Sequence, residues 1–253
     1  MGTRLAGKRA LVTGSTSNIG AAIAVAFGLE GAHVVVSGRN ATRGAAVVDR
    51  IRAAGGRADF VAAELDGSKA ASAELARKAS EVLGGGIDVL VNNAGAIVGD
   101  TTPDTSEDDL DRVYAVNVKA PFFLTSVVAP AMGQAGGGVI INLGSWVARL
   151  GIGVGASYAA SKGALETLTR AWSAEFGPLG VRVNAISPGV VHGELGEGHP
   201  AQPMMNGTPY GAVGDPAAIA SAAVYLASDD AAFVHGTVLD VDGGRVGVAV
   251  ISK

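Results

Sequence analysis

Short runs rich in β-branched residues alternate with longer alanine-rich stretches along almost the whole chain, and this alternation is the strongest constraint on its fold. Several of the short runs are nearly continuous valine, isoleucine and leucine, which is typical of strands buried on both faces. The repeated alternation predicts a parallel sheet with helices on both sides, in the α/β class. Right-handed crossovers make that sheet doubly wound. We expect about seven strands, at 9–13, 33–37, 58–62, 89–91, 139–143, 181–186 and 238–241, and helices at 18–30, 41–54, 69–83, 107–132, 157–177 and 216–227.

The chain has 253 residues, of which 48% are hydrophobic, and α/β folds of this length are often single domains. We therefore expect one domain over residues 1–253. The stretch from about 189 to 214 is rich in glycine and proline and shows no periodicity. It follows a strand end, where sheets of this kind bind ligands, so we expect it to cover the substrate. The alternative is a plain surface insertion.

The charge balance and the residue types that are missing exclude several classes of function. The net charge is −4 and no basic tract is present, which argues against a nucleic-acid partner. The chain has no cysteine, which rules out disulfides, thiolate zinc sites and cysteine nucleophiles. Its four histidines are scattered, so we expect no metal site. Without an apolar signal core or an 18-residue apolar run, we expect no membrane segment and a cytoplasmic protein.

Tyr158 and Lys162 lie one turn apart in the helix predicted at 157–177. At about 100° per residue both fall on a stripe that is otherwise apolar, so we expect them to face inward. A lysine on an inward face is costly unless it is paired or used. An ammonium group near a phenol lowers the pKa of the phenol, which would make Tyr158 a general acid/base near neutral pH.

The segment 13–20, with the sequence Thr-Gly-Ser-Thr-Ser-Asn-Ile-Gly, follows the first strand and opens the first helix. Small residues there allow a pyrophosphate to approach the backbone and to bind the free N–H groups of the helix N-terminus. The spacing is not G-x-G-x-x-G, and an ordinary glycine-rich turn is the alternative. Its place in the first strand–helix–strand unit favours a dinucleotide site formed by Gly14, Ser17, Asn18, Ile19 and Gly20.

Arg39 follows the second strand, where folds of this kind meet the adenosine ribose. An acidic residue at that place binds the 2′-hydroxyl of NAD, whereas an arginine suits the 2′-phosphate of NADP. The acid is missing here, so we expect NADP(H) in preference to NAD(H). A solvated surface arginine is the alternative.

Three further strand ends carry polar residues that are weak signals when each is taken alone. They are Asp66 after the third strand, Asn92-Asn93-Ala94-Gly95 at the fourth and Ser145 at the fifth. No histidine–acid pair accompanies Ser145 in the sequence, so a hydrolase triad is not indicated. A hydroxyl that donates to a substrate carbonyl is the better interpretation.

Together these motifs resemble those of the short-chain dehydrogenase/reductase family, of the classical type. The resemblance extends from Lys8 to about Gly244, with the motifs in family order and at family-like spacing. No single motif is specific, but their combination is. The motifs are Thr13-Gly14…Gly20, Asp66, Asn92-Asn93-Ala94-Gly95, Asn117, Ser145, Tyr158…Lys162 and Ser187-Pro188-Gly189.

The resemblance implies a Rossmann-type fold and four catalytic residues. Tyr158 would protonate the carbonyl oxygen, and Ser145 would polarise and orient that carbonyl. Lys162 would lower the pKa of the tyrosine and hold the nicotinamide ribose. Asn117 would keep a water-linked proton path to Lys162.

The resemblance also implies how the cofactor is held. Asp66 would accept from the adenine amino group, and Asn92 and Gly95 would pass near the adenosine and ribose. Pro188 and Gly189 would border the nicotinamide. The implied cofactor-binding residues are Gly14, Ser17, Asn18, Ile19, Gly20, Arg39, Asp66, Asn92, Gly95, Tyr158, Lys162, Pro188, Gly189 and Val191.

Two residues depart from the family pattern. The family usually has glycine where this chain has Asn18, but asparagine tolerates positive φ better than most residues do. The family commonly has a threonine touching the carboxamide where this chain has Gly193, which weakens the expected anchoring of the nicotinamide.

The sequence thus predicts an oxidoreductase that transfers a hydride between NADP(H) and a ketone or secondary alcohol. A 3-oxoacyl thioester is the first candidate substrate, and a small cyclic or sugar-like ketone is the second. A dinucleotide-binding regulator that has lost turnover is the alternative from another class. The resemblance further implies a homo-oligomer, a dimer or a tetramer.

Overall fold

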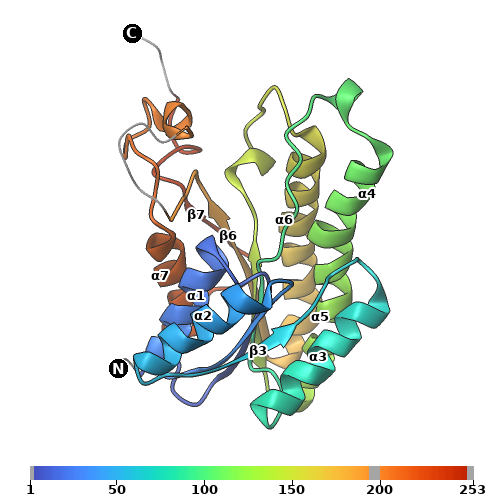
Figure 1. The fold of residues 1–253 in the computed structure, drawn as a ribbon, viewed down its shortest axis with the longest axis vertical. Coiled ribbons are helices and arrows are strands. Elements are labelled where there is room, and N and C mark those ends of the chain that lie inside the picture. Colours follow the sequence, from blue (N-terminus) through green and yellow to red (C-terminus); the bar gives the residue numbers. More distant parts are fainter. Residues whose placement is uncertain (1–2, 194–199, 250–253) are drawn as a thin grey trace.

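The computed structural model describes residues 3–193 and 200–249. Seven parallel strands form one sheet in the order β3-β2-β1-β4-β5-β6-β7 (Figure 1). The strand order reverses direction beside β1, as the doubly wound prediction requires. The strands are β1 (Arg9–Val12), β2 (His33–Gly38), β3 (Arg57–Ala62), β4 (Val89–Asn92), β5 (Gly138–Leu143), β6 (Val181–Pro188) and β7 (Val238–Val241).

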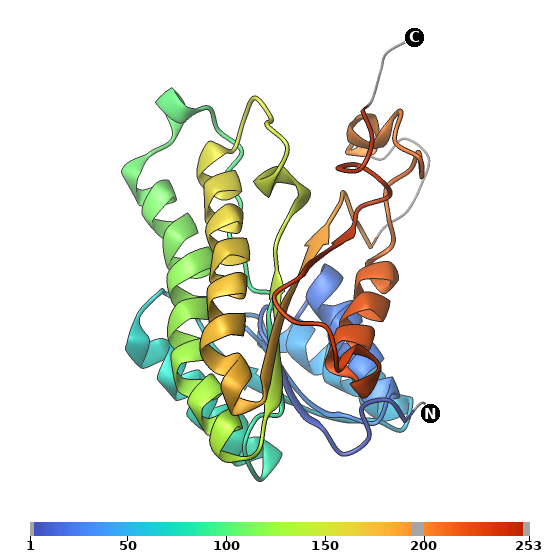
Figure 2. The ribbon, with the colours of Figure 1, turned by 180° about the vertical axis from the view of Figure 1, so that it is seen from behind.

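Helices cover both faces of the sheet. The α-helices are α1 (Asn18–Leu29), α2 (Ala41–Ala53), α3 (Lys69–Leu83), α4 (Glu107–Tyr114), α5 (Ala120–Gln134), α6 (Ala156–Phe176) and α7 (Pro216–Ala227). Figures 1 and 2 show α1, α2 and α7 on one face and α3, α4, α5 and α6 on the other.

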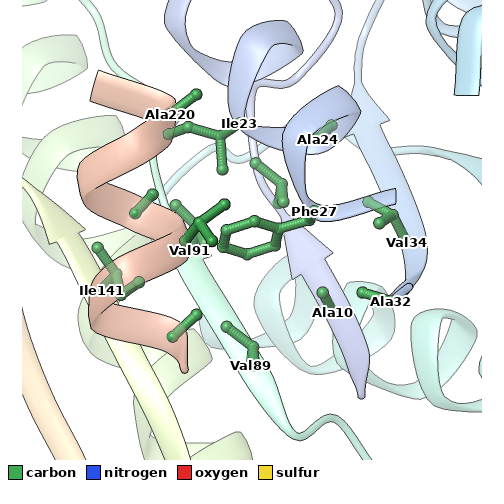
Figure 3. Close-up of a cluster of buried hydrophobic side chains, with 14 of the residues drawn as sticks. Ala10, Ile23, Ala24, Phe27, Ala32, Val34, Val89, Val91, Ile141 and Ala220 are labelled. Atoms are coloured by element: carbon green, nitrogen blue, oxygen red, sulfur yellow. The ribbon is translucent and has the colours of Figure 1, made fainter. Parts of the chain in front are cut away.

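The core is divided by the sheet into two apolar layers. On the α1 side the ring of Phe27 lies beside Val89 and Val91, so one helix residue fills the space between the central strands and α7 (Figure 3). On the other side Leu124 of α5 and Leu165 of α6 pack against the opposite faces of the same strands. Because strands alternate their side chains, both faces of β1, β4 and β5 are covered by apolar layers, which explains why valine, leucine and isoleucine dominate these strands.

The helix predicted as continuous over 107–132 is interrupted. A π-helical turn, Ala115–Lys119, separates α4 from α5 and carries Asn117 at its centre. Pro121 has no N–H and cannot donate the regular helical hydrogen bond to the main-chain oxygen of Asn117. The missing donor favours an irregular turn at this place, and such turns occur often at functional sites.

The combined helix Glu107–Gln134 is, by length and composition, apolar enough to cross a membrane, and 44% of its most apolar window is buried in the protein. The second half of this helix packs against α3 and α6. It is therefore a core helix of this fold, which accounts for its apolar composition.

The stretch predicted to cover the substrate lies only partly in the described structure, because 194–199 fall outside the described residues. Its base is closed by a bridge between Val191 and Gly214. Its later part contains a short helical turn, Gln202–Met205, and the N–H of Tyr210 donates to the oxygen of Gly243 at 3.1 Å. The described part therefore lies against the segment that follows β7.

Candidate active site

Tyr158 and Lys162 lie on the same side of α6, as the sequence predicts. The Nζ atom of Lys162 is 5.7 Å from the centroid of the Tyr158 ring. The lysine side chain is buried, with 4% of its surface exposed, and its Nζ donates to the main-chain oxygen of Leu143 at 2.7 Å. The end of β5 thus supplies the hydrogen-bond partner that a buried ammonium group needs.

The predicted lowering of the Tyr158 pKa is wrong for this structure. Burial raises the pKa of Tyr158, and a hydrogen bond from Ser145 offsets only part of that rise. Burial also lowers the pKa of Lys162 to about 8. The reason is that the low-polarity surroundings disfavour the charged form of both groups, and the ammonium group points to Leu143 rather than to the phenol oxygen.

Ser145 stands immediately beyond β5 and is buried, with 7% of its surface exposed. It is in an extended conformation and begins a short helical turn, in which its Oγ accepts from the N–H of Val147 at 3.5 Å. Its hydroxyl lies near enough to the phenol of Tyr158 to oppose the rise in the pKa of that phenol. The geometry therefore offers a carbonyl oxygen two neighbouring hydroxyl donors.

The side chain of Asn117 connects α6 to the loop after β4. Its Oδ1 accepts from the N–H of Ala96 at 2.7 Å, and its Nδ2 donates to the oxygen of Ala96 and to Oγ of Ser161, both at 2.9 Å. The neighbouring Gly95 lies so close that an added Cβ would be 3.5 Å from Asn117 Oδ1 and 3.7 Å from Lys162 Nζ. A larger residue at 95 would extend over the lysine.

The loop between β1 and α1 is fixed by two residues that the sequence reasoning did not assign to the site. Oγ1 of Thr13 accepts from the N–H groups of Asn93 and Ala94, each at 3.0 Å. The side chain of Asn93 donates to the main-chain oxygens of Thr13 at 2.8 Å and Gly14 at 3.0 Å. The predicted turn at 92–95 contained this signal, because the side chains of asparagine often bind a neighbouring backbone.

The two predicted glycines of this loop are required by close contacts. Gly14 has φ 62°, and an added Cβ would lie 2.7 Å from Cα of Ala94. An added Cβ at Gly20 would lie 2.5 Å from the oxygen of Gly14. Any side chain at either position would push the loop away from α1.

The N-terminus of α1 suits the pyrophosphate of a dinucleotide. Ser17 precedes the helix but makes no side-chain capping hydrogen bond, so the first N–H groups keep their capacity to donate. Among the described residues Asn18 is the only one other than glycine with positive φ, at 46°. A groove of about 390 Å³ lies beside it and is lined by Thr16, Ser17, Asn18, Ala21, Ala22, Arg43, Ala46, Val47, Arg50, Gly193, Asp215 and Pro216.

Arg39 and Asp66 stand beyond β2 and β3 and are exposed. The side chain of Arg39 is 80% exposed, and its nearest acidic partner, Glu64, is 4.0 Å away. Oδ1 of Asp66 accepts from the N–H of Ser68 at 2.8 Å, and the hydrogen bonds from Ser68 lower the pKa of Asp66. Both side chains keep polar atoms free for a ligand at this edge of the sheet.

The side chain of Asn92 lies in the core, so a contact with the cofactor would come from its main chain. Its side chain is 2% exposed, and its Nδ2 donates to Oδ1 of Asn142 at 2.8 Å. Asn142 in turn donates to Oγ1 of Thr169 at 2.8 Å. The side chain of Asn92 therefore ties β4 to β5 and α6 inside the core.

Three predicted nicotinamide neighbours follow the end of β6. Pro188 is the last strand residue, and an added Cβ at Gly189 would lie 2.6 Å from Cα of Asp242. Val191 forms the bridge to Gly214. Gly193 has open space around its Cα, so no structural contact requires glycine there.

The segments that follow strands β1 to β6 thus meet at one edge of the sheet, from the exposed Arg39 to the buried cluster of Asn117, Ser145, Tyr158 and Lys162. An uncapped helix N-terminus, a loop that needs glycine at positions 14 and 20, and a buried phenol beside a hydroxyl fit a dinucleotide and a carbonyl compound. The residues present therefore fit a nicotinamide cofactor.

Comparison with known proteins agrees with this interpretation. Residues 14–245 match a family model described as enoyl-(acyl carrier protein) reductase. The chain is 39% identical over 252 residues to 2,5-dichloro-2,5-cyclohexadiene-1,4-diol dehydrogenase from Sphingobium indicum, which covers 98% of this chain and all of the relative.

Solved structures show the same fold. A short-chain dehydrogenase/reductase from Serratia marcescens superposes with a TM-score of 0.88 at 35% identity, over 96% of this chain and 99% of the other. A 7 alpha-hydroxysteroid dehydrogenase complexed with NADH and 7-oxo glycochenodeoxycholic acid superposes with a TM-score of 0.89 at 38% identity, over 96% and 95% of the two chains. The chain therefore belongs to the short-chain dehydrogenase/reductase family and is an oxidoreductase that acts on CH–OH groups with a nicotinamide dinucleotide.

Proposed function

We propose that this protein interconverts a ketone and a secondary alcohol with NADP(H), and that Tyr158 exchanges the proton. The observation that carries this proposal is the burial of Lys162 one turn from Tyr158, with the Ser145 hydroxyl close enough to the phenol to lower its pKa. A buried lysine costs free energy, so a protein that only bound dinucleotide would gain nothing from it.

The raised pKa of Tyr158 keeps its phenol protonated at neutral pH. In the reducing direction Tyr158 donates that proton to the carbonyl oxygen, while Ser145 donates a hydrogen bond to the same oxygen and orients it. The bound nicotinamide supplies the hydride. Lys162 holds the cofactor ribose and adds positive charge near the phenol, which stabilises the phenolate left behind. Asn117 keeps the loop after β4 beside Lys162.

The preference for NADP(H) is supported by Arg39. Its guanidinium is exposed, and its nearest acidic partner lies 4.0 Å away, the limit of an ion pair. A free arginine at this strand end suits a 2′-phosphate. The similar hydroxysteroid dehydrogenase is complexed with NADH, so the choice within the family depends on residues of this kind. Direct titration of the protein with NADPH and with NADH tests the preference.

Two substrate classes are the candidates. The description of the matching family model supports a thioester of an acyl carrier, of which a 3-oxoacyl thioester carries the ketone that this site would reduce. The diol dehydrogenase from Sphingobium indicum and the hydroxysteroid dehydrogenase support a cyclic alcohol. Loss of NADPH absorbance with a panel of 3-oxoacyl thioesters, cyclic ketones and sugar-like ketones separates the two. Turnover of neither class would contradict both.

We also propose that the protein is a homo-oligomer. A groove of about 520 Å³ between α5 and α6 is lined mainly by apolar groups, and Phe122 at this place is 44% exposed. Exposed apolar surface of this kind is typical of contacts between subunits. Light scattering of the purified chain measures the mass, and a monomer would contradict this proposal.

A cytoplasmic location is the last part of the proposal. It is supported by the packing of the long apolar helix Glu107–Gln134 against α3 and α6, which accounts for its apolar composition without a membrane. Cell fractionation tests it, and recovery of the protein in the membrane fraction would contradict it.

A further inference from the structure

A buried carboxylate lies directly behind Ser145 and has no part in the reaction described above. Glu166 follows Lys162 by one turn on α6 and is 5% exposed. Its Oε1 is buried and has no hydrogen-bond partner. A buried carboxylate with an unsatisfied oxygen is costly, so its position calls for a physical reason.

The carboxyl group touches the turn that presents Ser145. An added Cβ at Gly144 would lie 2.9 Å from Oε1 of Glu166, so the glycine leaves room for this oxygen against the backbone. The main-chain N–H of Ser145 faces the carboxyl group and lowers its pKa. The carboxyl group therefore lies against the main chain that leads into Ser145.

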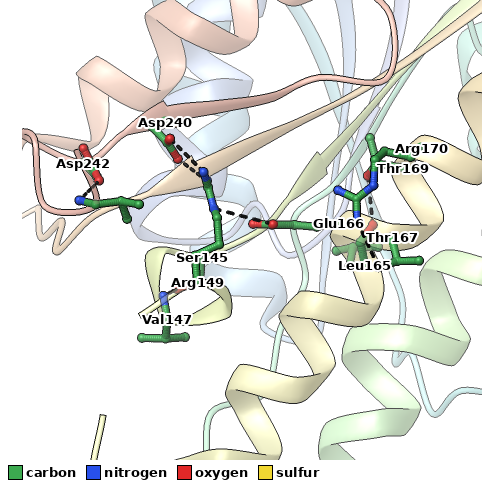
Figure 4. A network of polar contacts seen from close by, with 11 residues as sticks. Ser145, Val147, Arg149, Leu165, Glu166, Thr167, Thr169, Arg170, Asp240 and Asp242 are labelled. Atoms are coloured by element: carbon green, nitrogen blue, oxygen red, sulfur yellow. Dashed lines mark hydrogen bonds and ion pairs between the residues drawn. The ribbon is translucent and has the colours of Figure 1, made fainter. Parts of the chain in front are cut away.

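Arg149 also connects Glu166 to β7, the outermost strand on this side of the sheet. Nε of Arg149 is 3.7 Å from Oε2 of Glu166, and Nη1 of Arg149 donates to Oδ2 of Asp240 on β7 at 2.8 Å (Figure 4). Arg149 lies at the end of the short helical turn that Ser145 begins. Glu166 on α6 therefore holds the Ser145 end of this turn, and Asp240 on β7 holds the Arg149 end.

We propose that Glu166 is a positioning residue, which holds the main chain of Ser145 so that its hydroxyl stays directed at Tyr158 and at the carbonyl of the substrate. This inference rests on the proposed role of Ser145. Glu166 touches neither the substrate nor the cofactor and acts through the serine. Arg149 and Asp240 keep the carboxylate in place.

The charges around Glu166 decide its protonation. Burial raises its pKa, and the carboxylate of Asp240 adds to that rise, while Arg149, Arg170 and the N–H of Ser145 oppose it. A raised carboxyl pKa means that the ionised form is lost first as the pH falls. Removal of Arg149 takes away the largest opposing charge, so Glu166 would become neutral at a higher pH.

The decisive variants are Glu166→Leu and Glu166→Gln. Leucine fills the site but cannot accept from Ser145, whereas glutamine keeps an oxygen in reach. We expect kcat to fall at least about tenfold in Glu166→Leu, because misplacement of a reacting group is costly, and to recover largely in Glu166→Gln. The dissociation constant of the cofactor should not change. Glu175→Gln, at an exposed position of the same helix, is the control and should behave like the wild type.

A purely structural role predicts another pattern. Replacement of a buried charge by an apolar residue of similar size is often neutral or stabilising, so Glu166→Leu would keep its kcat if the carboxylate served stability alone. In a Ser145→Ala background, a residue that acts through the serine should change kcat less than twofold. Full kcat in Glu166→Leu, or an undiminished loss in the Ser145→Ala background, would overturn the proposal.

A second variant covers the case in which Glu166→Leu does not fold. Arg149→Met should shift the acid limb of the kcat profile to higher pH, and Glu166→Gln should abolish the part of that limb that belongs to Glu166. If the acid limb of the kcat profile were the same in both variants as in the wild type, the proposal would be overturned. If the wild type itself reduced no ketone with NADPH or NADH, the proposed function would fail, and this result is distinct from all the outcomes above.

Discussion

The Nζ atom of Lys162 donates a 2.7 Å hydrogen bond to the main-chain oxygen of Leu143. The last residue of β5 thus holds the ammonium group, although Tyr158 lies one helical turn away. The site contains two buried titratable groups, and burial favours the neutral form of each. The protein therefore begins its cycle with a protonated phenol beside a lysine whose charge is easily lost.

Burial of Lys162 gives the stability of the protein a defined pH dependence. Its pKa is about 8 in the folded chain, against 10.5 for an ordinary exposed lysine. Between these values the unfolded chain binds the additional proton, so the stability of the wild type rises with pH across this window. Lys162→Met removes the free-energy cost of burying the ammonium group. This variant should therefore be more stable than the wild type below pH 8, by on the order of 3 kcal/mol. The difference should shrink toward pH 10.5.

Urea unfolding at several pH values measures this effect. The matched control is Lys78→Met on α3, whose side chain is 48% exposed. If the free energy of unfolding gained by Lys162→Met stayed constant from pH 7 to pH 10, the lowered pKa of Lys162 would be contradicted.

The pH profile of the reaction follows from Tyr158. Its raised pKa means that the protonated phenol, which reduction requires, persists through neutral pH. We expect kcat/KM for reduction to be level near neutrality and to fall in the alkaline range, whereas kcat/KM for alcohol oxidation should rise with pH over that same range. Steady-state rates in both directions check this. Reduction that accelerates with pH would show that another group donates the proton.

The fold could be predicted from the sequence because its signal is repeated. Buried parallel strands need apolar residues on both faces, and each crossover helix shows its own periodicity, so the layers and the doubly wound arrangement follow from general rules. The proximity of Tyr158 and Lys162 could also be predicted from the sequence, because a spacing of four residues places them on one side of a helix.

Other parts of the site could not be predicted, since they depend on contacts between distant segments. The periodicity of 107–132 did not show the π-turn at Asn117. A single residue, Pro121, favours this turn because it lacks the N–H of a regular helix. Asn92 and Asn93 are equivalent in sequence, but the alternation of the strand directs one into the core and the other to the glycine loop. The pKa of Tyr158 depends on how deeply the cleft is buried, and a sequence does not give this depth.

Asn18 offers a test of the backbone at the dinucleotide loop. It has φ 46°, which favours glycine and asparagine over other residues. Asn18→Gly should leave the free energy of unfolding nearly unchanged, whereas Asn18→Val should lower it by roughly 1–2 kcal/mol and weaken cofactor binding. Chemical denaturation and fluorescence titration measure the two effects. Equal stability of the glycine and valine variants would contradict the conformational argument.

Arg39 offers a test of cofactor choice. Arg39→Ala should weaken NADPH binding at least about tenfold, because a charge-assisted hydrogen bond is lost, and should change NADH binding little. Arg57→Ala is the control, since this exposed arginine is the first residue of β3 and therefore lies at the opposite end of the strands from Arg39. An equal loss for both cofactors would remove the argument for a 2′-phosphate.

The role of Tyr158 as proton donor is the central claim, and Tyr158→Phe tests it most directly. Tyr225→Phe on α7 is the control for loss of a phenol elsewhere in the chain. The measurement is the rate of ketone-dependent NADPH oxidation, with cofactor binding followed by fluorescence on the same samples. We predict that Tyr158→Phe binds NADPH like the wild type and loses turnover about 100-fold or more. Turnover of Tyr158→Phe within tenfold of the wild-type rate would contradict the account.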